Sequence, residues 1–145
     1  MLAQKWLQYA LLSALCASLV GIFGKVGMTG IDANLATAFR SVVQALFVLA
    51  VCTALGTWST ARSLHGKAVM SIVAAGIAGG ASWLFYFKAL QAGTVSQVAP
   101  IDKLSMPLAV LLAVILLGDR PTWVNWAGIL MIAGGAYLAS LPRTR

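Results

Sequence analysis

The feature that most constrains this chain is the length and spacing of its apolar runs. A helix that crosses the ~30 Å hydrocarbon core of a bilayer needs ~20 mostly apolar residues, because each residue rises ~1.5 Å. Five runs of about this length follow one another along the 145 residues, and the connectors between them are too short to fold on their own. The sequence therefore predicts a single all-α integral membrane domain over 1–145, a five-transmembrane-helix bundle with helices over about 6–23, 34–55, 68–87, 94–117 and 123–141.

The charge content agrees with a membrane location. Charged residues make up 9% of the chain and hydrophobic residues 61%, whereas an ordinary globular domain carries roughly 25% charged residues. The formal charge is +7, but the basic residues are scattered singly between apolar runs and do not cluster as they do on a nucleic-acid-binding surface. The lipid bilayer is therefore the expected partner, and nucleic acid is not.

Motifs for catalysis are missing from the sequence. It contains no nucleotide-binding loop, no paired carboxylates and no nucleophile motif. The one histidine, His65, lies in a polar connector with Arg62 and Lys67, which is a poor setting for a metal ligand or a general base. The sequence predicts no enzyme, no cofactor and no metal site, so any transport would be secondary or facilitated.

The basic residues give almost no preferred orientation in the membrane. Short connectors make sequential helices antiparallel, and the basic residues outside the fourth run then fall four on the N-terminal side and five on the other: Lys5, Arg62, Lys67 and Arg120 against Lys25, Arg40, Lys88, Arg143 and Arg145. Such a small bias is typical of a dual-topology protein that pairs with an inverted copy of itself. The alternative is a single orientation that a partner protein or one dominant loop fixes.

Small residues recur at the spacing that lets membrane helices approach closely. Lipid gives no hydrophobic drive for helix association, so close backbone contact across small side chains supplies the attraction. We expect such contacts, within or between chains, at glycines of the first, third and fifth runs: Gly21, Gly24, Gly76, Gly80, Gly128 and Gly135.

The fourth run, 94–117, contains the most informative polar residues. Pro100, Asp102, Lys103 and Pro107 all fall inside an otherwise apolar helix. A charge at the centre of a membrane helix costs ~2.5–3.5 kcal/mol on insertion scales, so the two charges need partners or water. Neighbouring helical residues point ~100° apart, so we expect these two to engage other groups and not each other. Each proline also frees the carbonyl four residues earlier, which predicts that this helix lines a substrate path. The alternative is an ion pair that only locks helices together.

Two further groups of residues are candidates for the substrate path. Near the end of the third run, Ser82, Trp83 and Tyr86 lie close together in sequence and could form an aromatic cup for an organic cation. The ordinary alternative is an interfacial aromatic belt. Arg40, about two turns into the second run, is either an anchor whose side chain reaches the interface or a partner for Asp102.

The chain from the third run onward resembles a known family. The resemblance rests on the segments GGASWLFYFKAL from Gly79, ALQAGTVSQVAPIDKLS from Ala89 and LLGDRPTWVNWAGILMIAGGAYL from Leu116. These segments are similar to the EamA-type branch of the drug/metabolite transporter superfamily, in its short form with five helices per chain. The last segment is the most specific to the superfamily.

This resemblance implies an architecture and a function. Long members of the superfamily carry two inverted five-helix halves and move small metabolites, amino acids or drugs between them. The chain looks like one such half, which implies an antiparallel homodimer in the cytoplasmic (inner) membrane that transports or facilitates a small-molecule substrate, with export as the expected direction. It is more distantly similar to the small multidrug exporters, but the acidic residue of their first helix has no counterpart here. The rival interpretation is a non-transporting membrane subunit, or a half-transporter that needs a second protein.

Overall fold

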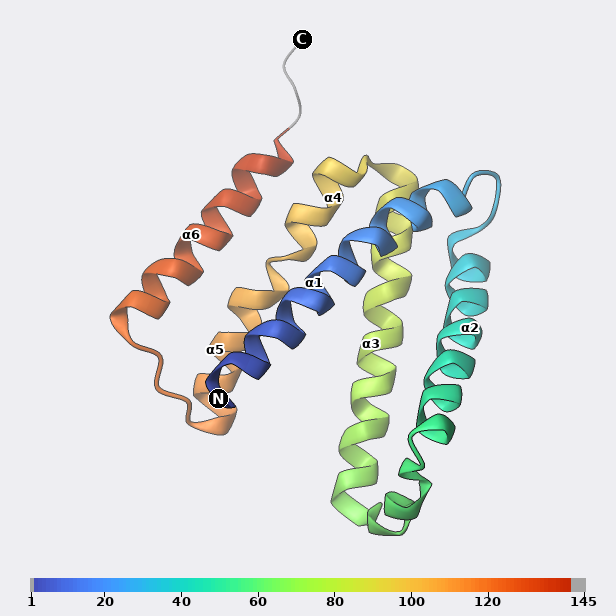
Figure 1. Cartoon of the computed structure of the whole chain (residues 1–145). Helices are drawn as coiled ribbons and strands as arrows, with labels where there is room; N and C mark the ends of the chain where they lie inside the picture. Colours follow the sequence, from blue (N-terminus) through green and yellow to red (C-terminus); the bar gives the residue numbers. More distant parts are fainter. Residues whose placement is uncertain (1, 142–145) are drawn as a thin grey trace. The chain divides into compact units, whose positions relative to one another are not determined.

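The computed structural model describes residues 2–141, and every regular element among them is a helix. In chain order these are α1 (Leu2–Gly27), α2 (Ala33–Ala54), the short 3-10 helix η1 (Thr57–Ser63), α3 (Gly66–Ala92), α4 (Val95–Asp102), α5 (Ser105–Leu117) and α6 (Trp123–Ser140) (Figure 1). Arg143 and Arg145, which enter the charge count, lie outside the described residues, as do the side chains of residues 2–4 and 62–63.

Four stretches of the described chain are long and apolar enough to cross a membrane, namely Lys5–Gly27, Ala33–Ala54, Gly66–Ala92 and Val95–Leu117. The chain is therefore a multi-pass helical membrane protein. The last helix, α6, has 18 residues and is not one of these stretches. A fifth span over 123–141, and the assignment of the chain as half of an inverted-repeat architecture, stay predictions.

Two helices are longer than the apolar runs that predict them. α1 and α3 continue past residues 23 and 87, through Lys25 and Lys88 respectively. A lysine need not end a membrane helix, because its aliphatic stem lies along apolar surface while its ammonium group reaches polar atoms. The fourth run differs most from its prediction, since Lys103 and Leu104 separate it into α4 and α5.

The described chain divides into two compact units, residues 2–23 with 92–141 and residues 24–91. In the first unit, α4 and α5 both pack along α6, where Ala136 is buried. Gly118 ends α5 with a left-handed φ of 75°, a conformation that glycine adopts without steric cost. Thr122 then caps α6, because its hydroxyl oxygen accepts a hydrogen bond from the backbone N–H of Asn125 at 3.4 Å.

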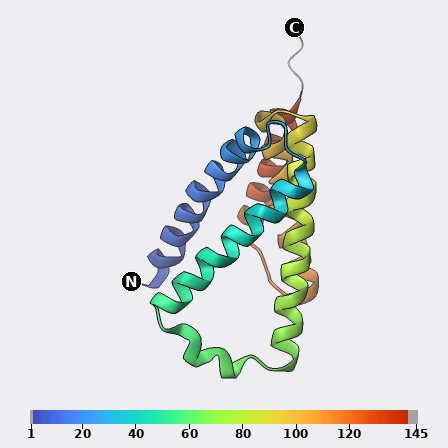
Figure 2. The ribbon, with the colours of Figure 1, turned by 90° about the vertical axis from the view of Figure 1, so that its right-hand side faces the viewer.

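The second unit is packed where α2 begins and α3 ends. Its buried residues are Met28 in the connector after α1, Ala33 and Thr37 of α2, and Phe87 and Leu90 of α3. The Thr37 hydroxyl is satisfied by the carbonyl of Ala33 at 2.7 Å. Away from this end α2 and α3 diverge, and η1 connects their far ends (Figure 2). The packed end therefore positions the polar side chains of this unit.

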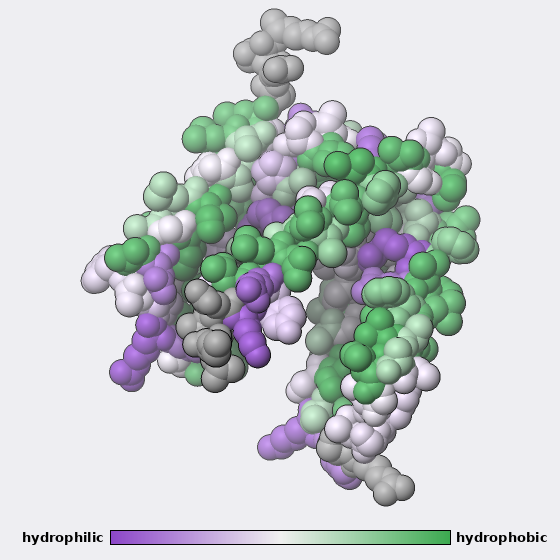
Figure 3. Space-filling view, in the orientation of Figure 1, coloured by the Kyte–Doolittle hydropathy of each residue, from purple (hydrophilic) through white to green (hydrophobic). Residues whose placement is uncertain are grey.

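Apolar side chains dominate the surface. Large apolar residues are exposed on every membrane-length stretch, and Phe39 and Met70 have exposed fractions of 73% and 74%. Hydrophobic residues cover much of α1 and α2 in the space-filling view (Figure 3). A water-soluble monomer rarely exposes apolar patches beyond a few hundred Å². Lipid or another protein chain must therefore cover these surfaces.

The start of α2 is held by a carboxylate cap. Asp32 accepts hydrogen bonds from the backbone N–H groups of Leu35 at 3.2 Å and Asn34 at 2.9 Å. These bonds lower the pKa of the Asp32 carboxyl group below its ordinary value of 3.8, and the bond from Leu35 has the largest effect. A lowered pKa means that the cap stabilises the fold above pH 3.8 and is lost only as the pH falls through the folded-state value.

Removal of this cap is expected to loosen the first turn of α2 only. In Asp32→Ala, amide hydrogens of residues 33–37 should exchange faster at neutral pH, whereas Asp32→Asn keeps a capping oxygen and should change little. Hydrogen exchange read by mass spectrometry checks this. Wild-type protein should show no loosening of this turn between pH 7 and pH 5, and a loss of protection in that range would contradict the lowered pKa.

Candidate functional site

The fourth span, Val95–Leu117, begins at a reciprocal cap. The side chain of Thr94 accepts a hydrogen bond from the backbone N–H of Gln97, and the side chain of Gln97 accepts one from the backbone N–H of Thr94. Pro100 lies inside the short helix α4 that follows. Because proline has no N–H, it cannot donate to the carbonyl of Ser96. One backbone acceptor of α4 therefore lacks its usual donor.

Pro107 explains why the helix stops and starts again. In a continuous helix its ring would collide with the preceding turn, and the carbonyl of Lys103 would lose its donor. The chain instead turns through Lys103 and Leu104, and Pro107 becomes the third residue of α5, in the first turn, where a missing N–H is tolerated. The carbonyl of Lys103 accepts from the N–H of Met106 at 3.0 Å. The prediction that Pro107 leaves this carbonyl without a donor is therefore wrong.

Asp102 and Lys103 form an ion pair at this interruption. The ammonium nitrogen of Lys103 lies 3.2 Å from a carboxylate oxygen of Asp102. The expectation that these neighbours do not engage each other is wrong, because α4 ends at Asp102 and the long side chain of Lys103 folds back from the turn. The side chains of Asp102 and Lys103 are 32% and 53% exposed. Both charges are thus only partly covered by the rest of the described chain, within an otherwise apolar span.

Arg40 lies against the aromatic residues of α3 in the second unit. Its guanidinium carbon is 3.8 Å from the ring centre of Trp83 and 5.5 Å from that of Phe87. Trp83 meets Tyr86 and Phe87 edge to face, with ring centres 5.4 Å and 5.8 Å apart. The face of Trp83 that could receive an organic cation is therefore occupied by a cation of the protein itself. Ser82 is exposed.

Gly24 lets α1 approach this aromatic cluster. A Cβ atom at Gly24 would lie 3.1 Å from Cε1 of Phe87, which is closer than ordinary van der Waals contact. Gly21 is buried. Within the described residues, a Cβ would meet nothing inside 4 Å at the other predicted packing positions, Gly76, Gly80, Gly128 and Gly135. Helix contacts at those positions stay predictions.

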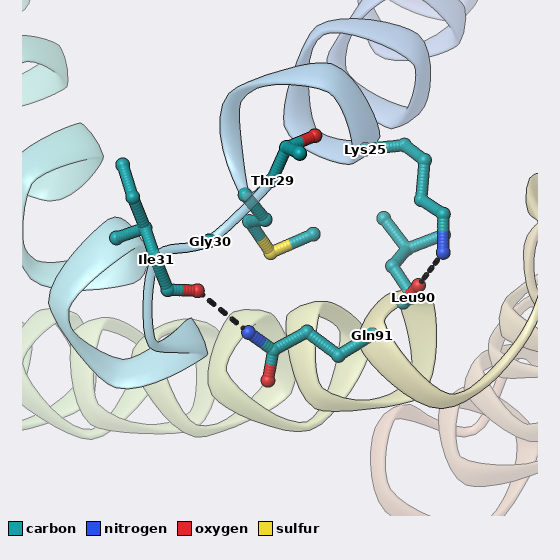
Figure 4. Close-up of a pocket in the computed structure, with 7 residues that line it drawn as sticks. Lys25, Thr29, Gly30, Ile31, Leu90 and Gln91 are labelled. Carbon is teal, nitrogen blue, oxygen red and sulfur yellow. Dashed lines mark hydrogen bonds between the residues drawn. The ribbon is translucent and has the colours of Figure 1, made fainter.

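Two polar side chains fix the end of α3 to the last turn of α1 and to the connector after it. The ammonium group of Lys25 donates to the carbonyl of Leu90, and the amide of Gln91 donates to the carbonyl of Ile31 at 2.8 Å (Figure 4). Leu90 is among the last four residues of α3, whose carbonyls have no donor in their own helix and favour a nearby cation. An open hollow lies between these two bonds. Its polar groups serve to hold the backbone.

The structure thus brings the candidate residues together in two groups. Pro100 and Pro107 flank the Asp102–Lys103 pair in the first unit. Arg40, Trp83 and Tyr86 form the second group with Phe87, and Gln44 joins them through a hydrogen bond to Arg40. Sequence reasoning missed Gln44. The position of Gln44, four residues after Arg40 on one helix face, was a signal that could have identified it.

Sequence comparison relates almost the whole chain to membrane transporters. The sequence model described as the EamA-like transporter family matches residues 4–141. A protein of Sinorhizobium sp. named "Uncharacterized transporter in cobO 3'region" is 39% identical over 140 residues, which cover 97% of this chain and 99% of that protein. No solved structure gives a significant match.

Proposed function

Since this chain belongs to the EamA-like transporter family, we propose that it is a secondary transporter or facilitator of small metabolites or drugs. The observation that carries the proposal is the partly exposed Asp102–Lys103 pair at the interruption of the fourth span. Charges and interrupted backbone at membrane depth are tolerated where they line a water-filled path, and transporters build solute sites in this way. We assign export across the cytoplasmic membrane as the direction.

An antiparallel homodimer is the form in which we propose that the protein works. The nearly equal numbers of basic residues on the two faces, four and five, support this form. The exposed apolar surface of the described residues also supports it, because such surface needs a cover. The solute path would then lie between two inverted copies.

Reconstitution of the purified protein alone is the direct test of transport. We expect proteoliposomes to exchange a radiolabelled solute from a panel of metabolites and drugs faster than empty liposomes. Cross-linking in the same membranes should trap a dimer. A monomer without flux for every solute class would contradict the proposal and favour a half-transporter that needs a second protein.

Dual topology predicts labelling of each terminus from both sides of the membrane. With single cysteines added at the two ends of a chain whose Cys16 and Cys52 are replaced, an impermeant reagent should label about half of the molecules at each end, because neither orientation is favoured. Adding two lysines to the connector around His65 should shift the ratio strongly. Labelling of one end only would show a fixed orientation.

A further inference from the structure

Arg40 is a cation inside a membrane span, and no carboxylate of its own unit balances it. Residues 24–91 contain one carboxyl group, that of Asp32, and this group caps the start of α2. The guanidinium of Arg40 lies on the face of Trp83 instead. An aromatic face attracts a cation through its quadrupole but leaves the net charge in place. The charge of Arg40 therefore remains uncompensated within this unit.

The guanidinium is also held in one orientation with hydrogen-bonding capacity left over. A guanidinium carries five N–H donors, and Nη1 of Arg40 donates to Oε1 of Gln44 at 3.1 Å. Its Nε is buried and finds no acceptor among the described residues. A buried donor of a charged group is costly to leave unsatisfied. The guanidinium therefore has donors that no acceptor of its own unit engages.

The position of Arg40 does not fit an interfacial anchor. Arg40 lies seven residues after Ala33, the first residue of α2, and so ~10 Å along the helix axis. A side chain that reached for the interface would point back toward the start of α2. The hydrogen bond to Gln44 instead directs Arg40 one turn further into the span. The guanidinium is thus held away from the start of α2.

We propose that Arg40 binds the anionic group of a solute, a carboxylate or a phosphate, so that this protein selects organic anions and zwitterions over organic cations. The planar guanidinium suits either group, because its fork of N–H donors can make two parallel, charge-assisted bonds. Trp83 and Gln44 act as positioning residues that hold the fork. That the bound anion is a transported solute rests on the proposed function. The binding itself does not, because it can be measured without transport.

Equilibrium binding to the purified full chain in detergent tests this inference. Thermal unfolding is followed at constant ionic strength with sodium glutamate, succinate, benzoate or phosphate, and with tetraethylammonium chloride as the cation probe. We expect saturable stabilisation by at least one anion and none by tetraethylammonium. The carboxylate and phosphate arms show which anionic group is preferred. Arg40→Gln should raise the apparent Kd for the anion about 10-fold to 100-fold, because charge-assisted bonds are lost.

Two further variants make the result decisive. Lys88→Gln removes the same charge from an exposed position on α3 and should leave the anion affinity unchanged. Arg40→Lys keeps the charge without the planar fork and should weaken binding even if Arg40→Gln does not fold. Stabilisation by tetraethylammonium alone, no saturable anion effect, or wild-type affinity in the Arg40 variants would overturn the inference. Anion binding without flux would contradict the transport function alone.

Discussion

Proteoliposomes that contain the Asp102→Asn protein are expected to show no solute flux above empty liposomes, although the variant is made and inserted normally. The substitution removes the carboxylate that lies 3.2 Å from the ammonium group of Lys103. The remaining ammonium would stand alone in an apolar span, where a lone charge costs ~2.5–3.5 kcal/mol on insertion scales. It would either draw in a counter-ion or change its position, and both outcomes block a path built around a neutral pair.

Two controls separate a functional pair from one that only joins helices. Asp119→Asn makes the same change at an exposed residue after α5 and should keep wild-type flux. The double variant Asp102→Asn with Lys103→Gln removes both charges and so removes the penalty of an unpaired one. We expect it to be as stable as the wild type and still inactive. Restored flux in the double variant would show that the pair is structural.

Gly24→Leu is expected to destabilise the packed end of the second unit by ~1–3 kcal/mol, the usual cost of overpacking. Even the first carbon of a side chain would lie 3.1 Å from Cε1 of Phe87. Phe87 is buried and cannot move freely, so the strain would pass to Trp83, whose ring centre is 5.8 Å away, and to Arg40 above it. Thermal unfolding in detergent measures the loss of stability.

Gly27→Leu is the matched control for this substitution. Both glycines lie in the last turn of α1, and the exchange of glycine for leucine raises helix propensity equally at each. A Cβ atom at Gly27 would meet nothing within 4 Å. The control should therefore unfold at or above the wild-type temperature. An equal loss in both variants would mean that Gly24 is not a packing contact.

Four of the five spans could be predicted from the sequence, but the contacts between side chains could not. Span positions follow from a local rule, since ~20 apolar residues bury a helix in lipid whatever their order. The interruption near Pro107 was also foreseeable from the chemistry of proline, although the bond from Met106 to the carbonyl of Lys103 was not. That bond depends on how tightly the chain turns after α4 ends, which the residue types do not specify.

The Arg40 site illustrates the same limit over a longer distance. The sequence singled out Arg40 and Trp83 separately, one as an anchor or ion-pair partner and the other as part of a cup. Their contact depends on the angle at which α2 meets α3. No local pattern encodes that angle. The sequence therefore identified these residues but not the contact between Arg40 and Trp83, which depends on how distant parts of the chain pack.

The turn between α4 and α5 also has a mechanical consequence. In a continuous helix, a sharp bend would break backbone hydrogen bonds at a depth where no water replaces them. Here the N–H groups of Lys103 and Leu104 already donate to the nearer carbonyls of Pro100 and Ile101. The backbone at this turn is thus held by shorter-range bonds than those of a continuous helix, and both charges lie at the turn itself.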